Sequence, residues 1–333
     1  MIDLFAGAGG MTLGFHRAGF RSVFAVEVEA AAAKTYAANF GAYVYPGPIE
    51  QVDSFPFGDV IIGGPPCQGF SPLGRDRDDL SRAALNGLWK EYLRAVHQVR
   101  PKVFVVENVP EFLKSAQFQT FLWTLRRSYP EYEIEHGVLN AADFGVPQRR
   151  RRGFVIASRI GAPRFPDKTR GPESRSGRPY ATVRDAIADL PLEPTGLDLH
   201  LGRNPKPSSI ERYKAVPEGG NRFDLGVNRP DLLPDCWKNK PSGTTDVFGR
   251  LWWDRPSFTI RTEFFKPEKG RYLHPRAHRP ITHREAARLQ TFPDDFIFEG
   301  TKIEIARQIG NAVPPVLAEA VAREVRRLLL KVR

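Results

Sequence analysis

The chain has 333 residues, which is enough for one large domain or two modest ones with a buried core. Only two cysteines, Cys67 and Cys236, are present, which excludes a disulfide scaffold and a four-cysteine zinc site and favours a reducing cytoplasm. The net charge of +11 favours a polyanionic partner, because Lys and Arg near phosphates release condensed counterions, although a soluble protein can also simply be basic.

The first half of the chain alternates apolar runs with segments of helical periodicity. The apolar runs predict strands that are buried on both faces, at 23–26, 59–62, 102–106 and 153–157. Helices are predicted at 30–39 and 85–99. This alternation predicts an α/β domain with a parallel sheet and helices on both sides. No run reaches the roughly 20 apolar residues of a membrane span, and no secretory signal is recognised.

The composition changes in the second half. Residues 193–255 are rich in Pro, Gly, Asn, Arg and Lys with little periodicity, which indicates a loop-rich subdomain or a linker. Several aromatic residues within this segment indicate that it packs. Helical patterns return at 282–290, where Thr282 and Glu285 predict a capping box, and at 315–330.

A glycine turn is the first motif with chemical content. Residues 3–10, Asp-Leu-Phe-Ala-Gly-Ala-Gly-Gly, are interpreted as a strand end, a turn and the start of a helix near Met11. Such a turn lets a ligand approach the backbone, and the helix N-terminus favours negative charge. Glu27 ends the next strand and could bind a ribose, although a tight turn beside a surface Glu would have the same pattern.

Cys67 and Glu107 each follow an apolar strand. Cys67 lies in 63–71, Gly-Gly-Pro-Pro-Cys-Gln-Gly-Phe-Ser, at the predicted carboxyl edge of the sheet, where open α/β folds bind ligands. Its proline and polar neighbours favour a reactive thiol over a buried one. Glu107 ends a strand at the same edge, where a partly desolvated carboxyl can hold or pass a proton; the alternative is a solvated or helix-capping Glu.

A basic run, Gln-Arg-Arg-Arg-Arg at 148–152, precedes the last apolar strand. If Arg152 begins that strand, Arg150 and Arg152 share a face and can aim fixed cations into a site. The other two arginines are expected to be solvated. Residues 308–315, Gln-Ile-Gly-Asn-Ala-Val-Pro-Pro, predict a rigid turn before the last helix.

Together these motifs resemble those of the DNA cytosine-5 methyltransferases of bacterial restriction-modification systems. The matching segments occur in the family's order and span the chain from Asp3 to Pro315: DLFAGAGG, Glu27, GGPPCQGFS, VVENVP, DFGVPQRRRRGF, ITHREAARLQTFPDDF and QIGNAVPP. A Pro-Cys-Gln, Glu-Asn-Val and Gln-x-Arg-x-Arg set in this order is highly specific, although each motif alone is not.

The resemblance implies a Rossmann-like, S-adenosylmethionine-dependent catalytic domain at 1–192, completed by 305–333. A smaller, loop-rich target recognition domain is expected at 193–304, with double-stranded DNA in the cleft between the two. The expected enzyme is a monomer without a metal, with a separate cognate restriction endonuclease as a candidate companion.

The resemblance also assigns roles to four residues. Cys67 would attack C6 of cytosine and make C5 nucleophilic, which is covalent catalysis. Glu107 would bind N3 and the exocyclic amine, Arg152 would contact O2, and Arg150 would support the site. The methyl group would come from S-adenosylmethionine, with S-adenosylhomocysteine as product. The base must leave the helix, because stacked DNA covers both faces of the C5–C6 bond.

Further residues are implied as binding contacts. The cofactor contacts are Phe5, Ala6, Gly7, Gly9, Gly10, Glu27, Val28, Ile49, Gly64, Pro66, Leu88, Asn311, Ala312 and Val313. The DNA contacts are Gln68 and Ser71, with Arg203, Arg222, Arg250 and Arg261 as candidates for guanine or phosphate contacts.

Two positions depart from the family pattern, and both concern adenine contacts. Pro48 stands where many members have an acidic residue, and Val28 stands where an aromatic residue is frequent. In addition, few residues precede Asp3, so either the first strand is short or the true start lies upstream.

Three other functions are weighed. An RNA methyltransferase of this fold is disfavoured, because Cys236 is followed by Trp237 and the Cys-Phe-Thr signature of the transfer-RNA branch is absent. A catalytically inactive DNA-binding regulator is favoured only by the departure at Pro48. It is disfavoured because the four residues with expected catalytic roles are intact: Cys67, Glu107, Arg150 and Arg152. A nicotinamide or flavin oxidoreductase would need G-x-G-x-x-G spacing, which residues 7–10 lack.

Overall fold

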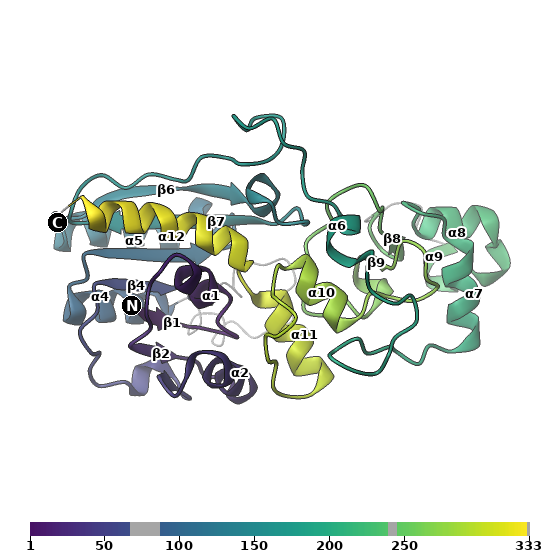
Figure 1. The fold of residues 1–333 in the computed structure, drawn as a ribbon, viewed down its shortest axis with the longest axis horizontal. Coiled ribbons are helices and arrows are strands. Elements are labelled where there is room, and N and C mark those ends of the chain that lie inside the picture. Colours follow the sequence, from purple (N-terminus) through teal and green to yellow (C-terminus); the bar gives the residue numbers. More distant parts are fainter. Residues whose placement is uncertain (67–86, 239–244, 332–333) are drawn as a thin grey trace.

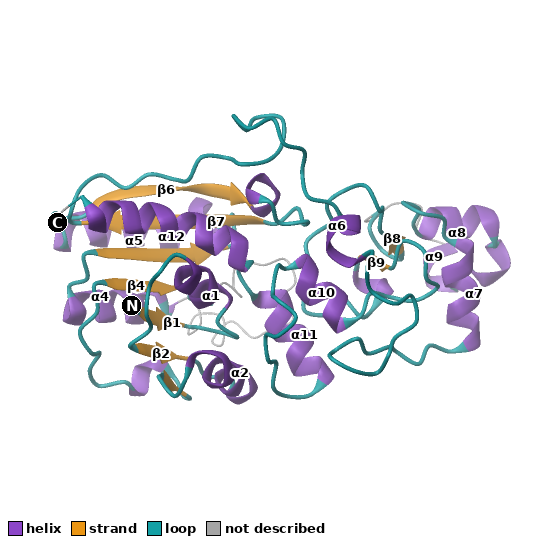
Figure 2. Cartoon of the chain, in the orientation of Figure 1, coloured by secondary structure: helices purple, strands orange, loops and turns teal. Residues whose placement is uncertain are grey.

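The structure, a computed structural model, describes residues 1–66, 87–238 and 245–331. Figure 1 shows an elongated molecule with two parts. A sheet part (1–158 with 315–331) has helices around a β-sheet, and a loop-rich part (183–311) lies at the other end. Figure 2 shows the contrast by element type, since loops dominate the second part. None of the helices in the described ranges combines the length and apolar character that a membrane span requires.

The sheet has seven strands within the described ranges, in the order β3-β2-β1-β4-β5-β7-β6. They are β1 (Ile2–Leu4), β2 (Phe24–Val26), β3 (Val44–Tyr45), β4 (Val60–Gly63), β5 (Val103–Asn108), β6 (Glu133–Asn140) and β7 (Arg151–Ser158). The four predicted strands are confirmed as β2, β4, β5 and β7. Strands β3 and β6 fall outside the predictions. The residues of β6 are largely exposed or half-buried, so this edge strand lacks the apolar run of a buried one.

The prediction of a parallel sheet is wrong at one strand. β7 pairs antiparallel with both β5 and β6, whereas the pairs among β1 to β5 are parallel. The apolar sequence of β7 indicates burial on both faces but not direction, because side chains alternate in the same way in either orientation.

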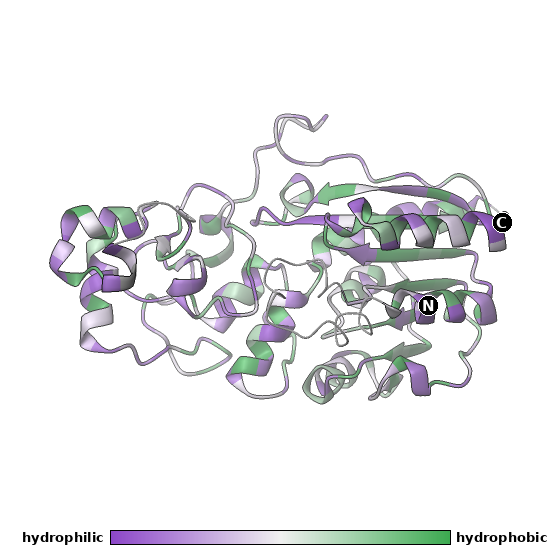
Figure 3. Cartoon of the chain, turned by 180° about the vertical axis from the view of Figure 1, so that it is seen from behind, coloured by the Kyte–Doolittle hydropathy of each residue, from purple (hydrophilic) through white to green (hydrophobic). Residues whose placement is uncertain are grey.

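Alternating side chains divide the sheet's core into two layers. On β5, Phe104 and Val106 belong to one core cluster, whereas Val103 and Val105 belong to the other. Helices α4 and α5 cover the first layer, and α1 and α12 cover the second. Figure 3 shows hydrophobic residues along most strands of this sheet. The helices of this part are α1 (Gly10–Arg17), α2 (Ala30–Phe40), α4 (Trp89–Val99), α5 (Ala116–Ser128) and α12 (Pro315–Leu330).

The last helix of the chain packs against the first. Gly14 of α1 permits a close approach, because a Cβ there would lie 2.5 Å from the Cβ of Ala318 and from the carbonyl oxygen of Pro315. The helices predicted at 30–39 and 315–330 are confirmed as α2 and α12.

The loop-rich part contains short elements around two small cores. Its helices are α6 (Val183–Ile187), α7 (Pro207–Ala215), α8 (Arg222–Asn228), α9 (Asp235–Lys238), α10 (His283–Leu289) and α11 (Lys302–Asn311), with strands β8 (Gly249–Arg250) and β9 (Arg271–Leu273). Short 3-10 turns lie in this part at Pro230–Leu232 and Pro267–Lys269. Those of the sheet part lie at Ile49–Gln51, Phe112–Lys114 and Ala141–Phe144. Tyr213, Leu225 and Phe248 pack in one core, so 193–255 is a packed subdomain, not a linker. The other core joins α6, α10 and α11, which lie on both sides of the expected boundaries at 192 and 305.

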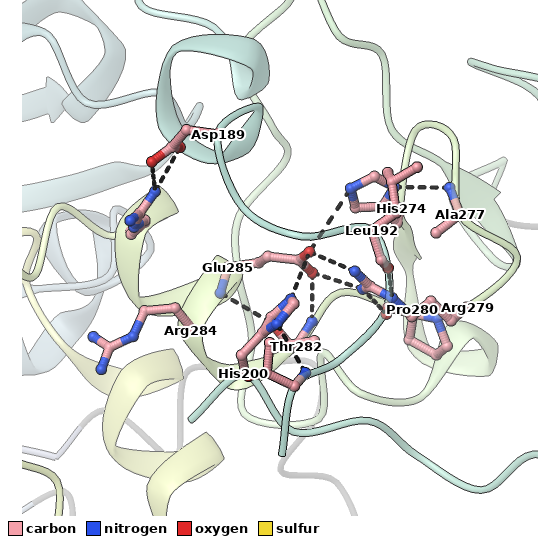
Figure 4. Close-up of polar contacts among 12 residues, drawn as sticks. Asp189, Leu192, His200, His274, Ala277, Arg279, Pro280, Thr282, Arg284 and Glu285 are labelled. Carbon is pink, nitrogen blue, oxygen red and sulfur yellow. Dashed lines mark hydrogen bonds and ion pairs between the residues drawn. The ribbon is translucent and has the colours of Figure 1, made fainter. Parts of the chain in front are cut away.

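A buried carboxylate joins segments of the loop-rich part, as Figure 4 shows. Glu285 is fully buried and accepts two hydrogen bonds from Arg279, at 2.9 and 2.7 Å. It also accepts the backbone N–H of Thr282 at 2.7 Å, which confirms the predicted capping box at the start of α10. Nε2 of His200 and Nε2 of His274 lie 3.6 and 3.7 Å from its Oε1. Although burial opposes ionisation, these partners lower the pKa of Glu285 to about 2.

Candidate active site

Strand direction brings the predicted site residues to one edge of the sheet. β4 and β5 end at this edge, and β7 begins there because it runs antiparallel to them. In the register between β5 and β7, Asn108 is opposite Gly153 and Glu107 is opposite Phe154. A parallel β7 would have placed Arg152 at the opposite edge, so the antiparallel direction of β7 is what brings Arg152 to Glu107.

Glu107 and Arg152 form a buried ion pair at this edge. Nε of Arg152 lies 3.0 Å from Oε1 of Glu107, and the two side chains are 15% and 11% exposed. Burial raises the pKa of Glu107, and the charges of Arg152 and Arg150 oppose this rise. Within the described residues Oε1 has no hydrogen bond of good geometry. The carboxyl can therefore hold a proton and still exchange hydrogen bonds with a ligand.

The segment that leads to Cys67 is tied to Glu107's strand. Nδ2 of Asn108 donates to the carbonyl oxygen of Pro65 at 3.1 Å, and Oδ1 of Asn108 accepts the N–H of Val109 at 2.9 Å. A Cβ at Gly64 would lie 2.9 Å from Oε2 of Glu107. The chain before Cys67 thus lies against the carboxylate. Asn108 follows Glu107 in the Glu-Asn-Val motif, and its contact with Pro65 was not predicted.

Three predicted contacts, Cys67, Gln68 and Ser71, lie outside the described residues. The last described residue before them is Pro66, three positions after β4 ends at Gly63.

Arg150 does not share the environment of Arg152. It is 0% exposed, and its Nη1 and Nη2 donate to the carbonyl oxygens of Ile260 at 3.0 Å and Gly310 at 2.8 Å. The strand begins at Arg151, so Arg150 precedes it. Arg150 therefore fastens the sheet part to the loop-rich part and does not share a strand face with Arg152, while its charge still acts on Glu107; its supporting role at the site stays a prediction.

The glycine turn and Glu27 form a second polar site at the same edge. Oε2 of Glu27 accepts the N–H of Gly7 at 2.7 Å, and Oε1 accepts the N–H of Glu29 at 2.8 Å. Burial raises the pKa of Glu27, and these two hydrogen bonds oppose the rise. Among the residues that the structure describes, no atom lies within 4 Å of a Cβ built on Gly7, so the turn has open space there where a ligand can approach.

The other glycines of the turn have packing roles. A Cβ at Gly9 would lie 2.2 Å from the ring of Phe40, and one at Gly10 would lie 2.5 Å from the carbonyl oxygen of Val313. This contact brings the turn at 308–315 beside the glycine turn. Close packing thus requires glycine at Gly9 and Gly10, and their expected contacts with the cofactor stay a prediction.

The remaining cofactor candidates differ in how exposed they are. Asn311 is exposed and Val28 is 62% exposed. Ile49 is 2% exposed and Leu88 is partly buried, both in the first core layer, so the side chain of Ile49 faces the core and not the site. Phe5, Ala6, Ala312, Gly64 and Pro66 line or adjoin the two turns and strand ends.

The residues present fit the nucleoside part of S-adenosylmethionine. The carboxylate of Glu27 lies at a strand end, next to the open glycine turn and the exposed Val28. In nucleotide-binding sheets an acidic residue at such a strand end binds ribose hydroxyls.

Two of the four candidate DNA-reading arginines are buried. Arg250 is 2% exposed and donates to the backbone carbonyls of Val216, His274 and Ala277 at 2.8, 2.5 and 2.7 Å. Arg222 is 7% exposed and lies over the ring of Phe223. Neither side chain faces solvent, so the prediction that they meet DNA is wrong in this structure.

The other two candidates are exposed. Arg203 lies 3.8 Å from Glu268 in a solvent-exposed ion pair. Arg261 is exposed beside Gly310, where a Cβ would lie 2.5 Å from the carbonyl carbon of Arg261.

Comparison with known proteins gives concordant matches. A family model described as C-5 cytosine-specific DNA methylase matches residues 1–327. The chain is 36% identical to Type II methyltransferase M1.HphI of Haemophilus parahaemolyticus, over 97% of this chain and 86% of that protein. It is 34% identical to Type II methyltransferase M.NgoFVII of Neisseria gonorrhoeae, over 95% of this chain and 83% of that protein.

Solved structures show the same fold. A putative DNA modification methyltransferase encoded within an E. coli prophage superimposes with a TM-score of 0.72 at 26% identity, over 99% of both chains. The S. pombe Dnmt2 methyltransferase superimposes with a TM-score of 0.65, over 99% of this chain and 98% of that one, but at 18% identity this is a likeness of fold alone. The family model spans both parts of the molecule and all the motifs quoted above up to 315. The chain therefore belongs to the C-5 cytosine-specific DNA methylase family and is a DNA (cytosine-5-)-methyltransferase.

Proposed function

We propose that this enzyme transfers a methyl group to C5 of a cytosine flipped out of a specific sequence in duplex DNA, as the protective methylase of a type II restriction-modification system. The observation that carries the proposal is the buried pair of Glu107 and Arg152 beside the segment that leads to Cys67. The names of the similar proteins, which are type II methyltransferases, support the restriction-modification setting.

The mechanism follows from the chemistry of cytosine. C5 is a poor nucleophile, and addition of the Cys67 thiolate to C6 breaks the ring's aromaticity and makes C5 enamine-like. Glu107, whose pKa is raised by burial, holds a proton for N3 and accepts a hydrogen bond from the exocyclic amine. Arg152 donates to O2. After methylation, loss of the C5 proton and departure of Cys67 restore the ring.

Binding of the methyl donor is assigned to the second polar site. When bound, S-adenosylmethionine supplies an electrophilic methyl group, with S-adenosylhomocysteine as the product. Glu27 would hold the ribose hydroxyls, the open turn at Gly7 would admit the remainder, and Asn311 would close the other side. Pro48 and Val28 leave the adenine without the family's frequent partners.

Recognition of the target sequence is assigned to residues 193–304. Duplex DNA would lie between this region and the sheet part, with Arg203 and Arg261 as the candidate contacts that remain exposed. We propose that the enzyme acts as a monomer, without a metal, and in the bacterial cytoplasm; a cognate nuclease would act separately. A molecular mass that rises with protein concentration would contradict the monomer.

One experiment tests the function directly. Purified protein is incubated with S-adenosylmethionine and unmethylated genomic DNA, and 5-methylcytosine is mapped at base resolution, with Cys67→Ser in parallel. One short motif is expected to become methylated by the wild type only. If DNA is bound but no base is modified, the inactive-regulator alternative gains support, and modification of transfer RNA alone would support the RNA alternative.

A further inference from the structure

A closed circuit of buried hydrogen bonds joins the loop-rich part to the start of β7. It runs through the side chains of Gln148, Gln290 and Arg150 and through the backbone of Ile260, Ile309 and Gly310. The three side chains are each 0% exposed. We propose that Gln148 and Gln290 are positioning residues for methyl transfer. Through these two side chains the loop-rich part fixes the position of Arg152. This inference rests on the proposed function, because it takes Arg152 as the group that meets the base.

Gln148 makes the central contacts of the circuit. Its Nε2 donates to Oε1 of Gln290 at 2.9 Å and to the carbonyl oxygen of Leu289 at 3.2 Å. Its Oε1 accepts the N–H of Ile260 at 2.9 Å. The amide of Gln148 therefore uses both of its N–H donors and its carbonyl oxygen. Gln148 thus binds the end of α10 and the backbone of Ile260 at the same time.

Gln290 and Arg150 close the circuit. Nε2 of Gln290 donates to the carbonyl oxygen of Ile309 at 2.6 Å, and Nη2 of Arg150 donates to the next carbonyl, that of Gly310, at 2.8 Å. Nη1 of Arg150 then donates to the carbonyl oxygen of Ile260 at 3.0 Å, whose N–H is held by Gln148. A shift of any member must disturb the others, because buried donors and acceptors that lose a partner carry a large penalty.

The backbone of the same segment has little freedom to absorb such a shift. The N–H of Arg149 donates to the carbonyl oxygen of Ser257 at 2.8 Å, and the N–H of Ser257 donates to the carbonyl oxygen of Pro147 at 2.9 Å. The hydroxyl of Thr259 donates to the carbonyl oxygen of Arg149 at 2.9 Å. β7 begins two residues later, at Arg151.

Arg152 is therefore placed from two sides. β5 and β6 hold its strand within the sheet, and the circuit holds Gln148 and Arg150 just before that strand. Its guanidinium lies 3.0 Å from Glu107, so movement of the circuit changes the relation between the cation and the carboxyl. Small misplacements of reacting groups can cost on the order of 100-fold in rate without a matching loss of binding.

The test compares three glutamines that are all buried and hydrogen-bonded. Gln148→Met and Gln290→Met remove the amides of the circuit at nearly constant length. Gln308→Met is the matched control, since Gln308 bonds to Glu299 at 2.8 Å and Thr35 at 2.7 Å, outside the circuit. For each variant the melting temperature, the Kd for target DNA, the KM for DNA and the kcat are measured.

The circuit variants are expected to lose at least about tenfold in kcat, while the Kd and KM for DNA change less than about threefold. The control is expected to lose similar thermal stability but keep its kcat per folded molecule. The double variant should be no slower than the slower single one, because the two amides act as a unit. An unchanged kcat in the circuit variants, or an equal loss in the control, would overturn the proposal.

A milder change keeps the test informative if the circuit variants do not fold. Thr259→Val removes only the hydroxyl that holds the carbonyl of Arg149, at a half-buried position. It is expected to lower kcat by about threefold with the Kd for DNA unchanged, and a wild-type kcat in this variant would contradict the inference. Failure of the wild type itself to methylate DNA would overturn the proposed function first, so the two failures are distinguishable.

Discussion

Glu107 experiences opposing influences on its pKa. Burial raises the pKa, the charges of Arg152 and Arg150 oppose it, and the rise prevails. The carboxyl of Glu107 thus stays neutral to higher pH than that of a solvated glutamate, which the proposed role of holding a proton for N3 requires.

The Glu107→Gln variant is expected to lose about 100-fold or more in kcat, because the amide cannot pass a proton. In the wild type, kcat should fall as the pH rises through the raised pKa of Glu107, and this dependence should vanish in the variant. Steady-state methylation measured across pH checks both. Glu111→Gln, at an exposed position four residues later, is the control; equal turnover of Glu107→Gln and the wild type would refute the role.

Asp3 offers a separate prediction about stability. It is buried beneath the glycine turn and accepts a hydrogen bond from Thr12, and burial raises its pKa from 3.8 to about 7. Since the folded state holds this proton more tightly than the unfolded state, stability should fall as the pH rises from about 4 to about 7, by roughly 4 kcal/mol at most. Asp3→Asn should remove most of that fall, measured by urea unfolding at several pH values. If Asp3→Asn and the exposed control Asp53→Asn show the same dependence of unfolding free energy on pH, Asp3 is not the source of the fall.

Single residues also show where sequence reasoning reaches its limit. Glu107 and Arg152 could be named from short motifs that resemble those of a known family, although the predicted parallel sheet would have placed them at opposite edges. Arg250 looks like any other basic residue of its region, and only the folded chain shows the carbonyl oxygens of Val216, His274 and Ala277 around its guanidinium. The burial of a charge depends on residues distant in sequence, which no local pattern reveals.

Elements with a strong local signal were the most predictable. The bounds of α12 match the 315–330 pattern, and the capping box of α10 involves the two predicted residues. The direction of β7 and the presence of β6 could not be predicted in this way, because the first depends on chain connectivity and the second on a half-exposed edge.

The contact between α1 and α12 gives a prediction at the scale of elements. Gly14→Ala should destabilise the fold by about 1–3 kcal/mol, because the new methyl group would overlap atoms of Pro315 and Ala318. Denaturant unfolding measures the effect. Gly87→Ala, where a Cβ would meet no atom of the described residues within 4 Å, is the control and should be neutral or slightly stabilising. Equal stability of the two variants would show that the helices can separate at no cost.

At the scale of the whole molecule, the net charge of +11 predicts DNA binding that weakens steeply with salt. Arg261→Ala should reduce the slope of log K against log salt by about 1 if this residue contacts a phosphate. Arg323→Ala, on the exposed side of α12, should leave the slope unchanged. Binding isotherms at several salt concentrations measure the slope for each variant. If Arg261→Ala has the same slope as the wild type, Arg261 does not contact a phosphate.

The packing of α12 on α1 also has a consequence for synthesis of the enzyme. The helix that completes α1's layer of the core is translated roughly 300 residues after α1, which takes on the order of tens of seconds. Until then, the face of the sheet that α12 covers has no partner from within the chain. A nascent chain therefore completes this layer of the core only once α12 has been translated, and a chain that stops before α12 leaves the face of α1 uncovered.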